Sequence, residues 1–188
     1  MNEPVNRWTS PDHALAYLSY ADRVPHRTEG EQVVLELLSA GARRVLDLGT
    51  GDGRLLALAR AHCPGASAVA LDFSETMLEL AASRFADDPQ VAVQRWDLDD
   101  PLQGAQLGSF DAVISSFAIH HLEHDRKRAL YAEIFELLEP GGVFCNLEHV
   151  ASPTPKLHEQ FLAALGETAE TEDPSNKHTR VLPHYAWG

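Results

Sequence analysis

The feature that most constrains the fold is an apolar run that leads directly into three closely spaced glycines. Residues 45–56 read VLDLGTGDGRLL, with glycines at positions 49, 51 and 53. The apolar residues are typical of a buried strand, and a helical pattern follows the glycines. Glycines at alternate positions let the backbone turn tightly and approach a ligand that a Cβ atom would push away. The segment therefore predicts a strand, a ligand-binding turn and a helix whose free N–H groups can bind a carboxylate or a phosphate.

The rest of the chain repeats this strand and helix alternation. Strand-like apolar runs alternate with longer helical patterns from Gln32 onward, which is typical of an α/β domain with a mainly parallel sheet. Additional helices are predicted at residues 28–40, ahead of the first strand, and at residues 155–165, after the fifth. Five strands are predicted, at residues 44–48, 67–71, 91–96, 110–115 and 143–147.

We predict one structural domain with three segments. Residues 1–31 form an amino-terminal helical cap or lid with less regular spacing, and residues 32–165 form the ligand-binding body. Residues 166–188 form an irregular tail, because acidic residues cluster there and prolines interrupt the pattern. Within the body, residues 97–109 are predicted to be a loop, because they contain one proline and two glycines.

Charge and cysteine usage exclude several classes of protein. The 28 acidic residues outnumber the 15 basic ones and give a net charge of −13, which argues against binding to nucleic acids or anionic membranes. The two cysteines, Cys63 and Cys145, form no C-x-x-C pair, so we expect neither disulfides nor a zinc site, and a reducing cytoplasmic location. No basic stretch leads into an apolar run at the amino terminus, and no segment approaches the roughly 20 apolar residues of a membrane span.

The spacing of the glycines and of three acids narrows the choice of ligand. A dinucleotide-binding turn reads G-x-G-x-x-G, whereas here the third glycine comes early, at Gly53, and Arg54 replaces the last one. Asp47, at the end of the first strand, repels a pyrophosphate but attracts an ammonium or sulfonium group. Asp72 ends the second strand, where related folds hydrogen-bond ribose hydroxyls, and Asp97 closes the third. Because carboxyl ends of parallel strands meet at one sheet edge, the three acids predict a single ligand site.

These motifs resemble those of small, free-standing class I S-adenosylmethionine (SAM)-dependent methyltransferases. The resemblance covers roughly residues 33–150 and implies a Rossmann-like, doubly wound, mainly parallel sheet with flanking helices. It also implies methyl transfer from SAM to a small-molecule acceptor, with S-adenosylhomocysteine (SAH) as product. The matching residues are Asp47 with Gly49, Gly51 and Gly53 (first motif), Asp72 (ribose-binding acid), Asp97 with Leu98 (adenine-binding pair), residues 110–117 (fourth strand) and residues 138–142 (the turn before the fifth strand).

The resemblance also implies which residues contact the cofactor. Asp47 and the glycine turn would hold the methionine moiety, with Ser116 near the sulfonium, and Phe73 and Met77 would lie close to the adenosine. Core packing is an equally good interpretation of Phe73 and Met77. Asp72 has the alternative role of a helix cap before residue 74, and residues 99 and 100 are alternative acceptors to Asp97.

Histidines after the fourth strand are candidates for proton transfer. A sulfonium methyl group is already a strong electrophile, so transfer mainly requires a nucleophile held in line. If the acceptor is a hydroxyl or a protonated nitrogen, His120 is the predicted base. A structural role for His120 or His121, such as capping the helix at Asp125, is the alternative. Residues 120–124 include three histidines and one glutamate and could suggest a metal site. We expect none, because consecutive residues in a turn rarely converge on one ion.

The cap and the carboxyl terminus raise two further expectations. Tyr17, Tyr20 and Arg27 are predicted lid residues over the cofactor, with surface packing as the alternative. Members of the family usually continue after the fifth strand with a helix and an antiparallel strand pair. Only 23 residues remain from Gly166, so we expect that pair to be missing, with one short strand at most at residues 179–182.

An exposed fifth-strand edge would favour a homodimer. The short carboxyl terminus leaves a second hypothesis open, namely a non-catalytic or truncated protein that binds SAM or SAH without turnover. A third hypothesis, a nicotinamide-dependent oxidoreductase, is disfavoured by the glycine spacing and by Asp47.

Overall fold

The computed structural model describes residues 10–21, 26–148 and 154–165. No helix among these residues has both the length and the apolar character that a membrane crossing requires. Short 3₁₀ helices occur at Leu102–Ala105 and Ile119–His121. The main elements are α1 (Pro11–Ala21), α2 (Arg27–Leu37), β1 (Arg44–Leu48), α3 (Arg54–His62), β2 (Ser67–Asp72), α4 (Glu75–Arg84), β3 (Val91–Arg95), β4 (Phe110–Ser116), α5 (His124–Leu137), β5 (Leu138–Leu147) and α6 (Pro155–Leu165).

The five strands form one sheet in the order β3-β2-β1-β4-β5, and every pairing is parallel. This confirms the predicted α/β fold with a doubly wound parallel sheet. Successive strands are added on one side of β1 up to β3, and β4 and β5 then follow on the other side. Open α/β sheets bind ligands at such a switch point, outside the carboxyl ends of the strands. The fold therefore directs attention to the loops after β1, β2 and β4.

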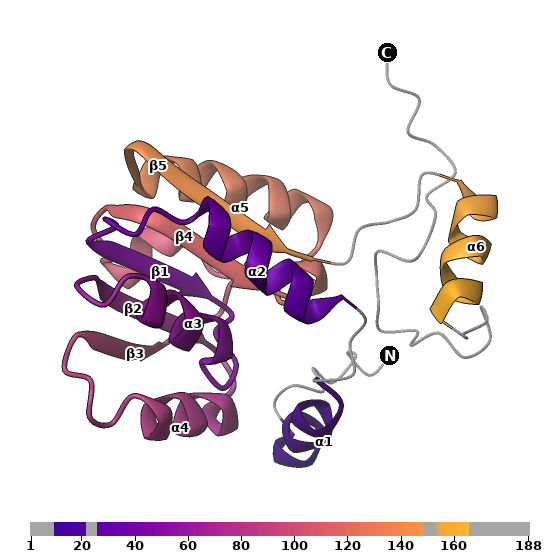
Figure 1. Ribbon diagram of the computed structural model, residues 1–188, viewed down its shortest axis with the longest axis horizontal. Coiled ribbons are helices and arrows are strands. Elements are labelled where there is room, and N and C mark those ends of the chain that lie inside the picture. Colours follow the sequence, from indigo (N-terminus) through magenta and orange to yellow (C-terminus); the bar gives the residue numbers. More distant parts are fainter. Residues whose placement is uncertain (1–9, 22–25, 149–153, 166–188) are drawn as a thin grey trace.

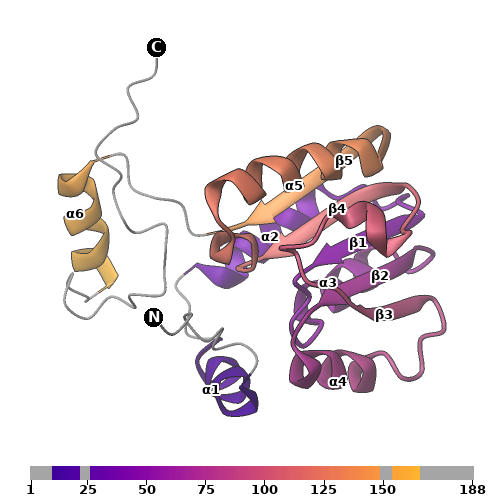
Figure 2. The ribbon, with the colours of Figure 1, turned by 180° about the vertical axis from the view of Figure 1, so that it is seen from behind.

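Helices cover both faces of the sheet, as Figures 1 and 2 show from opposite sides. One apolar cluster joins α2 and α3 to the sheet through residues such as Val34, Leu56 and Ile114. A second cluster joins α5 and the 3₁₀ segments to the opposite face through residues such as Leu48 and Ile134. Because both faces are covered, the central strands are apolar on both sides, which is typical of parallel sheets.

Several predicted boundaries were wrong. The predicted helical cap contains the regular helix α1, whereas α2 ends at Leu37, short of the predicted residue 40, because the backbone is extended at Leu38. β5 begins at Leu138 rather than at residue 143. The residues predicted as a turn lie within this strand because the pairing with β4 shifts register between Phe110 and Ala112, which gives β5 extra residues there.

Other expectations lie partly or wholly outside the described residues. The predicted helix at residues 155–165 is confirmed as α6. The predicted boundary between residues 31 and 32 falls within α2, which packs on β5 and α3. The described strands are all parallel, but residues 166–188, including the predicted short strand at 179–182, lie outside the described part of the chain. The missing strand pair and the irregular tail therefore stay predictions.

Candidate functional site

The glycine turn between β1 and α3 has the backbone conformation that its sequence predicts. Gly49, Gly51 and Gly53 have φ angles of 68°, 55° and 82°, in the left-handed region that side chains other than glycine rarely adopt. A Cβ atom at Gly49 would overlap the methyl group of Ala118, and one at Gly53 would lie 2.6 Å from the Phe85 ring. At Gly51, a Cβ atom would meet no described atom within 4 Å. The outer glycines thus pack the turn against the protein, and the middle one borders open space.

Asp47 lies beneath this turn as a buried carboxyl group, with 1% of its surface exposed. Its Oδ2 accepts a hydrogen bond of 2.6 Å from the Thr50 hydroxyl. Burial raises the pKa of Asp47 to about 7, and the nearby Asp72 and Asp52 carboxylates raise it as well. A cationic ligand beside Asp47 would stabilise the charged carboxylate and offset the cost of burying it. The buried Asp47 carboxyl group therefore fits an ammonium or sulfonium group as its partner.

Asp72 connects the end of β2 to the glycine turn. Its Oδ2 accepts a hydrogen bond of 2.8 Å from Gly51 N, and its Oδ1 accepts one of 2.9 Å from Ser74 N. Burial raises the pKa of the Asp72 carboxyl, and these backbone hydrogen bonds oppose the rise. The bond to Ser74 N fixes the turn into α4, although no side chain makes a capping bond at Ser74 itself. Each carboxylate oxygen can accept a second hydrogen bond, so this bond is compatible with a ribose hydroxyl as an additional donor.

The end of β3 lies close to the same turn. Asp97 is exposed, and its charge contributes to the raised pKa of Asp72. Its Oδ1 accepts a hydrogen bond of 3.0 Å from Asp99 N. Leu98 is buried and approaches within 3.9 Å of the Cβ position at Gly49. The structure thus brings together the three sequence motifs that the resemblance assigns to one cofactor.

Phe73, Met77 and Ser116 occupy different environments. Met77 on α4 is buried, with 3% exposed, and Phe73 is half-buried. The Ser116 Oγ is buried and has no hydrogen-bond partner among the described residues. An unpaired buried hydroxyl costs about 1–3 kcal/mol. A ligand group that pairs with this hydroxyl would remove that cost, so Ser116 fits the predicted position beside a cofactor.

His120 forms a close pair with a carboxylate that sequence reasoning missed. The His120 Nδ1 lies 2.5 Å from Glu148 Oε1, and His120 N donates a hydrogen bond of 2.8 Å to Glu148 Oε2. Both side chains are buried, with exposed fractions of 6% and 8%. The His121 ring lies against that of His120, with 3.8 Å between the ring centroids. Glu123 occupies the amino-terminal capping position of α5, and its side chain makes no capping bond.

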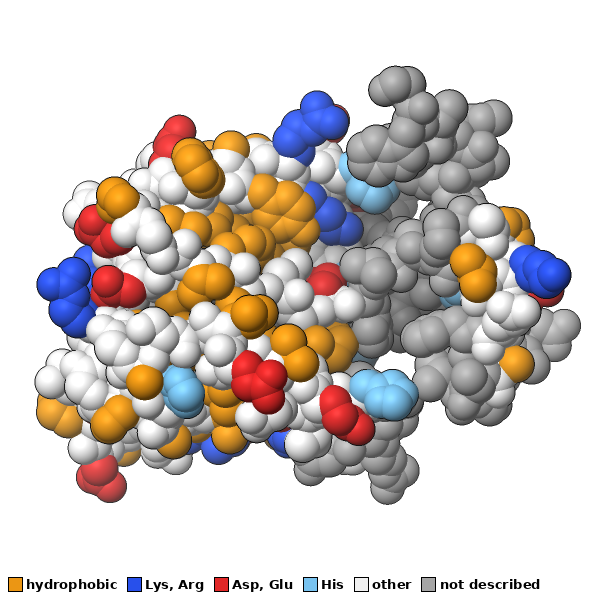
Figure 3. All heavy atoms as spheres, turned by 45° about the horizontal axis from the view of Figure 1, so that its top comes forward, with side chains coloured by type: hydrophobic (Ala, Val, Ile, Leu, Met, Phe, Trp, Pro, Cys, Tyr) orange, Lys and Arg blue, Asp and Glu red, His pale blue; other side chains and the backbone are white. Residues whose placement is uncertain are grey.

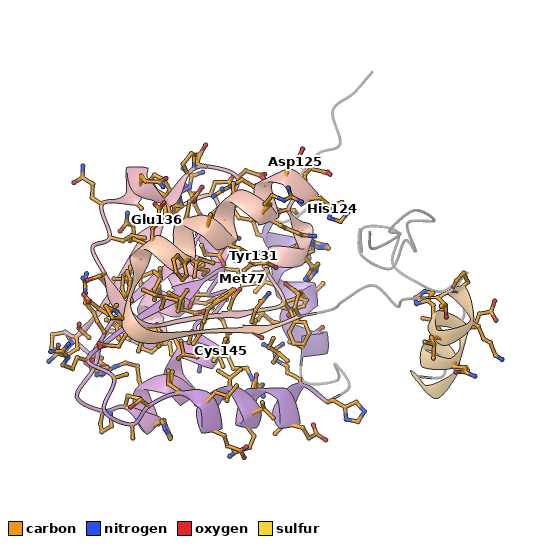
Figure 4. All side chains as sticks on the ribbon, turned by 90° about the horizontal axis from the view of Figure 1, so that it is seen from above. Met77, His124, Asp125, Tyr131, Glu136 and Cys145 are labelled. Atoms are coloured by element: carbon orange, nitrogen blue, oxygen red, sulfur yellow. The ribbon has the colours of Figure 1, made fainter. Side chains whose placement is uncertain are left out.

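The α5-facing side of β5 continues this polar cluster. Side chains alternate along a strand, so residues 144, 146 and 148 share a face. Phe144 lies 5.8 Å from Tyr131 of α5 between ring centroids, and Figure 4 shows Tyr131 between α5 and β5. Burial raises the pKa of Tyr131, the Glu148 carboxylate adds to the rise, and a hydrogen bond with Asn146 opposes it. The Asn146 Oδ1 is buried and has no hydrogen-bond partner among the described residues.

A second group of charged residues joins the cap helices to the glycine turn. Arg27 Nε donates to Glu31 Oε1 at 3.0 Å, and Arg54 donates to both Glu31 oxygens, at 2.8 and 3.0 Å. Arg27 also donates to the Tyr17 hydroxyl at 3.3 Å, and its guanidinium lies 5.6 Å from the centre of the Phe117 ring. Arg27 is thus buried in this network. The side chain of Tyr20 lies outside the described residues.

A cavity between α2 and α3 lies outside this site. Within the described ranges, no group of three His, Cys, Asp or Glu residues is arranged to hold a metal ion. None of the residues that we assign to the cofactor lines a cavity of about 300 Å³ between α2 and α3. That cavity is lined by Thr28, Glu31, Gln32, Leu35, Arg54, Ala57, Leu58 and Arg84.

Sequence reasoning found the turn and its acids but missed Glu148, Glu31 and Thr50. Thr50 lies inside the glycine motif, and its spacing of three from Asp47 was the available signal. Glu148 lies 28 residues after His120, and Glu31 lies 23 residues before Arg54. Neither separation forms a recognisable pattern, so these pairs become visible only in the folded chain.

Comparisons with known proteins give a consistent result. Residues 46–144 match the model of a family described as methyltransferase domain. The chain is similar to the demethylmenaquinone methyltransferase of Clavibacter sepedonicus, with 38% identity over 113 residues, which cover 60% of this chain and 43% of that protein. The chain spans about half the length of the curated relatives that it matches.

Solved structures are similar as well. The DesVI protein of Streptomyces venezuelae matches with a TM-score of 0.60 and 28% identity, covering 76% of this chain and 60% of that one. The SAM-bound amino pentose methyltransferase CalS10 of Micromonospora echinaspora matches with a TM-score of 0.55 and 28% identity, covering 69% of this chain and 54% of that one.

Proposed function

Because the chain belongs to the methyltransferase domain family, we propose that it is a SAM-dependent methyltransferase that acts on a small-molecule acceptor. The observation that carries this proposal is the buried carboxyl group of Asp47 beside the open space at Gly51. A pyrophosphate would be repelled by Asp47, whereas the methionine part of SAM brings an ammonium and a sulfonium group. The similarity to a SAM-bound methyltransferase structure supports the same cofactor.

The residues that would hold SAM lie at the ends of four strands. Asp47, with the turn formed by Gly49, Gly51 and Gly53, would bind the methionine moiety. Asp72 would accept ribose hydroxyl protons, and Asp97 with Leu98 would bind the adenine. Phe73 and Met77 would contact the adenosine, and Ser116 would lie near the sulfonium. When bound, SAM supplies an electrophilic methyl group, so the protein has to orient the acceptor and exclude water.

A small molecule is the acceptor class that charge and similarity favour. The net charge of −13 disfavours nucleic acids and anionic membranes as partners. The Clavibacter relative is named a demethylmenaquinone methyltransferase, and demethylmenaquinone is a small molecule. Both cysteines are buried and free, which is compatible with our proposal of a cytoplasmic location.

We also propose that residues 1–31 act as a lid over a domain at residues 32–165. The Tyr17–Arg27–Glu31–Arg54 network supports this role, because it connects the cap helices to the first residue after the glycine turn. Residues 166–188 would be a tail that adds no strand pair to the sheet.

A homodimer through the edge of the sheet is part of the proposal. β5 is the last strand on its side of the described sheet. Nearby on α5, Phe135 is 80% exposed and Tyr131 is 43% exposed. Figure 3, which turns the top of Figure 1 towards the viewer, shows hydrophobic side chains gathered on this part of the molecule. An apolar surface beside an unpaired strand edge favours association with a second copy.

Calorimetry with SAM, SAH and NAD tests the proposed function. We expect binding of SAM and SAH and no binding of NAD. Binding of NAD alone would overturn the proposal. Binding of SAM and SAH without release of SAH from SAM, over a broad panel of acceptors, would instead favour the alternative of a non-catalytic cofactor-binding protein.

A further inference from the structure

The pair formed by His120 and Glu148 has the geometry of a proton-accepting dyad. The carboxylate contacts His120 twice, at the ring Nδ1 and at the backbone N–H. A backbone N–H that donates to Oε2 favours the ionised carboxylate. The 2.5 Å contact between Oε1 and Nδ1 is then a hydrogen bond in which Nδ1 donates. Burial of both side chains keeps this bond away from competing water.

This bond decides which ring nitrogen is basic. A histidine ring that donates through Nδ1 carries its lone pair on Nε2, so Nε2 is the nitrogen that can accept a proton. The imidazolium that results would be stabilised by the negative charge of Glu148. Its titratable neighbours include His121, whose ring lies against His120, and the hydroxyl groups of Tyr131 and Tyr17, whose pKa values the Glu148 charge raises.

The dyad lies in the part of the chain that packs against the glycine turn. Ala118, two residues before His120, occupies the space where Gly49 would have a Cβ atom. Ser116, two residues earlier again, has the buried and unpaired hydroxyl described above. Glu148 directly follows Leu147, which pairs with Ser116 at the carboxyl end of the sheet. The base and its carboxylate thus adjoin the proposed cofactor site.

We propose that Glu148 is a positioning residue that fixes His120 as the proton acceptor, and that the methyl acceptor is therefore a compound that must give up a proton on methylation, such as a hydroxyl compound. This inference rests on the proposed function. The hydroxyl oxygen forms the new bond to the methyl carbon while the carbon–sulfur bond breaks and its electron pair stays on sulfur. The hydroxyl proton moves to Nε2 of His120, so the positive charge passes from the sulfonium to the imidazolium. Solvent then removes that proton.

The first test measures the tautomer of His120 by long-range ¹H–¹⁵N NMR on the full chain, with the signal assigned by its loss in His120→Asn. We expect the Nδ1–H tautomer in the wild type. Glu148→Gln keeps one acceptor oxygen for the two donors that Glu148 serves, the backbone N–H and the Nδ1–H of His120, so the Nδ1–H tautomer should persist only in part. Glu148→Ala removes the acceptor, and we expect a shift towards the Nε2–H form. Glu136→Ala, at the exposed far end of α5 in Figure 4, is the control.

The second test separates a base from a merely structural histidine by using matched acceptors. A panel of phenols must lose a proton on methylation, whereas the corresponding thiophenols are largely ionised at neutral pH. SAH release is measured for each pair in the wild type, Glu148→Gln and Glu136→Ala. We expect Glu148→Gln to lower kcat with phenols by about 10–100-fold, with KM little changed, and to leave the thiophenol rates within about twofold.

Each outcome decides one statement. An Nε2–H tautomer in the wild type would overturn the positioning role of Glu148. Equal losses with phenols and thiophenols would show a structural role, and turnover of thiophenols alone would overturn the hydroxyl acceptor class. SAH binding without methylation of either series would also overturn the hydroxyl acceptor class. Failure to bind SAH would instead contradict the proposed function, and the tautomer measurement would still judge the dyad.

Discussion

The two sides of the site are built in different ways. On the side of β1, β2 and β3, the polar groups are held by the backbone: Asp72 accepts two backbone N–H groups, and the glycine turn closes by local hydrogen bonds. On the side of β4 and β5, His120 depends on Glu148, which lies 28 residues away. The first side is a cradle in which a carboxylate accepts backbone N–H groups of the glycine turn and of the turn into α4, and the second depends on one His–Glu pair between the ends of two strands. Adding a single Cβ atom can therefore disrupt the first side, and removing a single charge can disrupt the second.

The largest effect is expected for Asp47→Asn, on the cradle side. Burial raises the pKa of Asp47 to about 7, whereas the unfolded chain ionises near its usual value of about 4. The folded state thus binds the proton more tightly, and the free energy of unfolding of the ligand-free protein falls as the pH rises from about 4 to about 7. This loss amounts to at most about 4 kcal/mol.

The Asn variant should lack that loss. At pH 8 we expect its free energy of unfolding to exceed that of the wild type by up to about 4 kcal/mol, with equal values near pH 4. SAM binding should weaken in the same variant. Urea titrations between pH 4 and 8 measure the difference, and parallel curves for the two proteins would contradict the assignment.

Glu31→Ala tests whether the ion pairs of Glu31 with Arg27 and Arg54 hold the cap helices against the glycine turn. Without its carboxylate, Arg27 stays buried and uncompensated, and breaking such a pair costs about 3–5 kcal/mol. Because 32% of the Arg54 side chain is exposed and can rehydrate, we expect a loss of about 3 kcal/mol in urea unfolding. Glu36→Ala, an exposed residue of the same helix, is the control, with a change below about 0.5 kcal/mol. A loss below about 1 kcal/mol for Glu31→Ala would show that the network does not hold the cap.

Gly51→Val should separate binding from folding. The new side chain enters open space, so the fold bears only the strain of the positive φ angle, about 1–3 kcal/mol. The same side chain would occupy the proposed cofactor site, and we expect the Kd for SAH to rise more than 100-fold, about 2.7 kcal/mol. Calorimetry measures the affinity. Gly65→Val, at a distant glycine that also borders open space, should bind SAH normally, and retained binding in Gly51→Val would refute the cradle.

The smallest effect is expected at Ser116, on the side of β4. Its Oγ is buried without a described partner, so Ser116→Ala should stabilise the ligand-free protein by up to about 1 kcal/mol. The neighbouring Ser115 donates to Leu48 O at 2.8 Å, and Ser115→Ala should destabilise the protein by about 1 kcal/mol. Thermal unfolding of the two variants measures these shifts. Stability changes of the same sign in both variants would mean that the Ser116 hydroxyl has a hydrogen-bond partner in solution.

The same contrast explains what the sequence could predict. The glycine turn, Asp47, Asp72 and Asp97 lie within short segments whose spacing follows from backbone geometry, so their convergence could be anticipated. The mainly parallel α/β sheet followed from the alternation of strands and helices. Glu148 could not be predicted, because a single glutamate after a strand has no distinctive spacing, and its importance depends on the register of β5 against β4.

The bounds of α1 and the start of β5 were hard to predict for a similar reason. The cap was predicted to be helical, but the irregular apolar spacing near Tyr17 gave α1 no bounds, because that helix is supported by contacts with α4 and with Arg27 rather than by one continuous apolar face. The start of β5 was placed too late because Pro140 and two glycines resemble a turn. In the structure, the shifted register lets these residues extend the strand.

That shifted register determines where the chain tolerates changes in length. The extra residues of β5 precede Val143, and pairing then runs one to one from Ala112 with Val143 to Ser116 with Leu147. Adding or removing a residue at positions 139–142 would alter only the irregular stretch. The same change after Val143 would exchange the two faces of the strand and carry Glu148 away from His120. An insertion series along β5 should thus divide sharply into silent and inactivating sites.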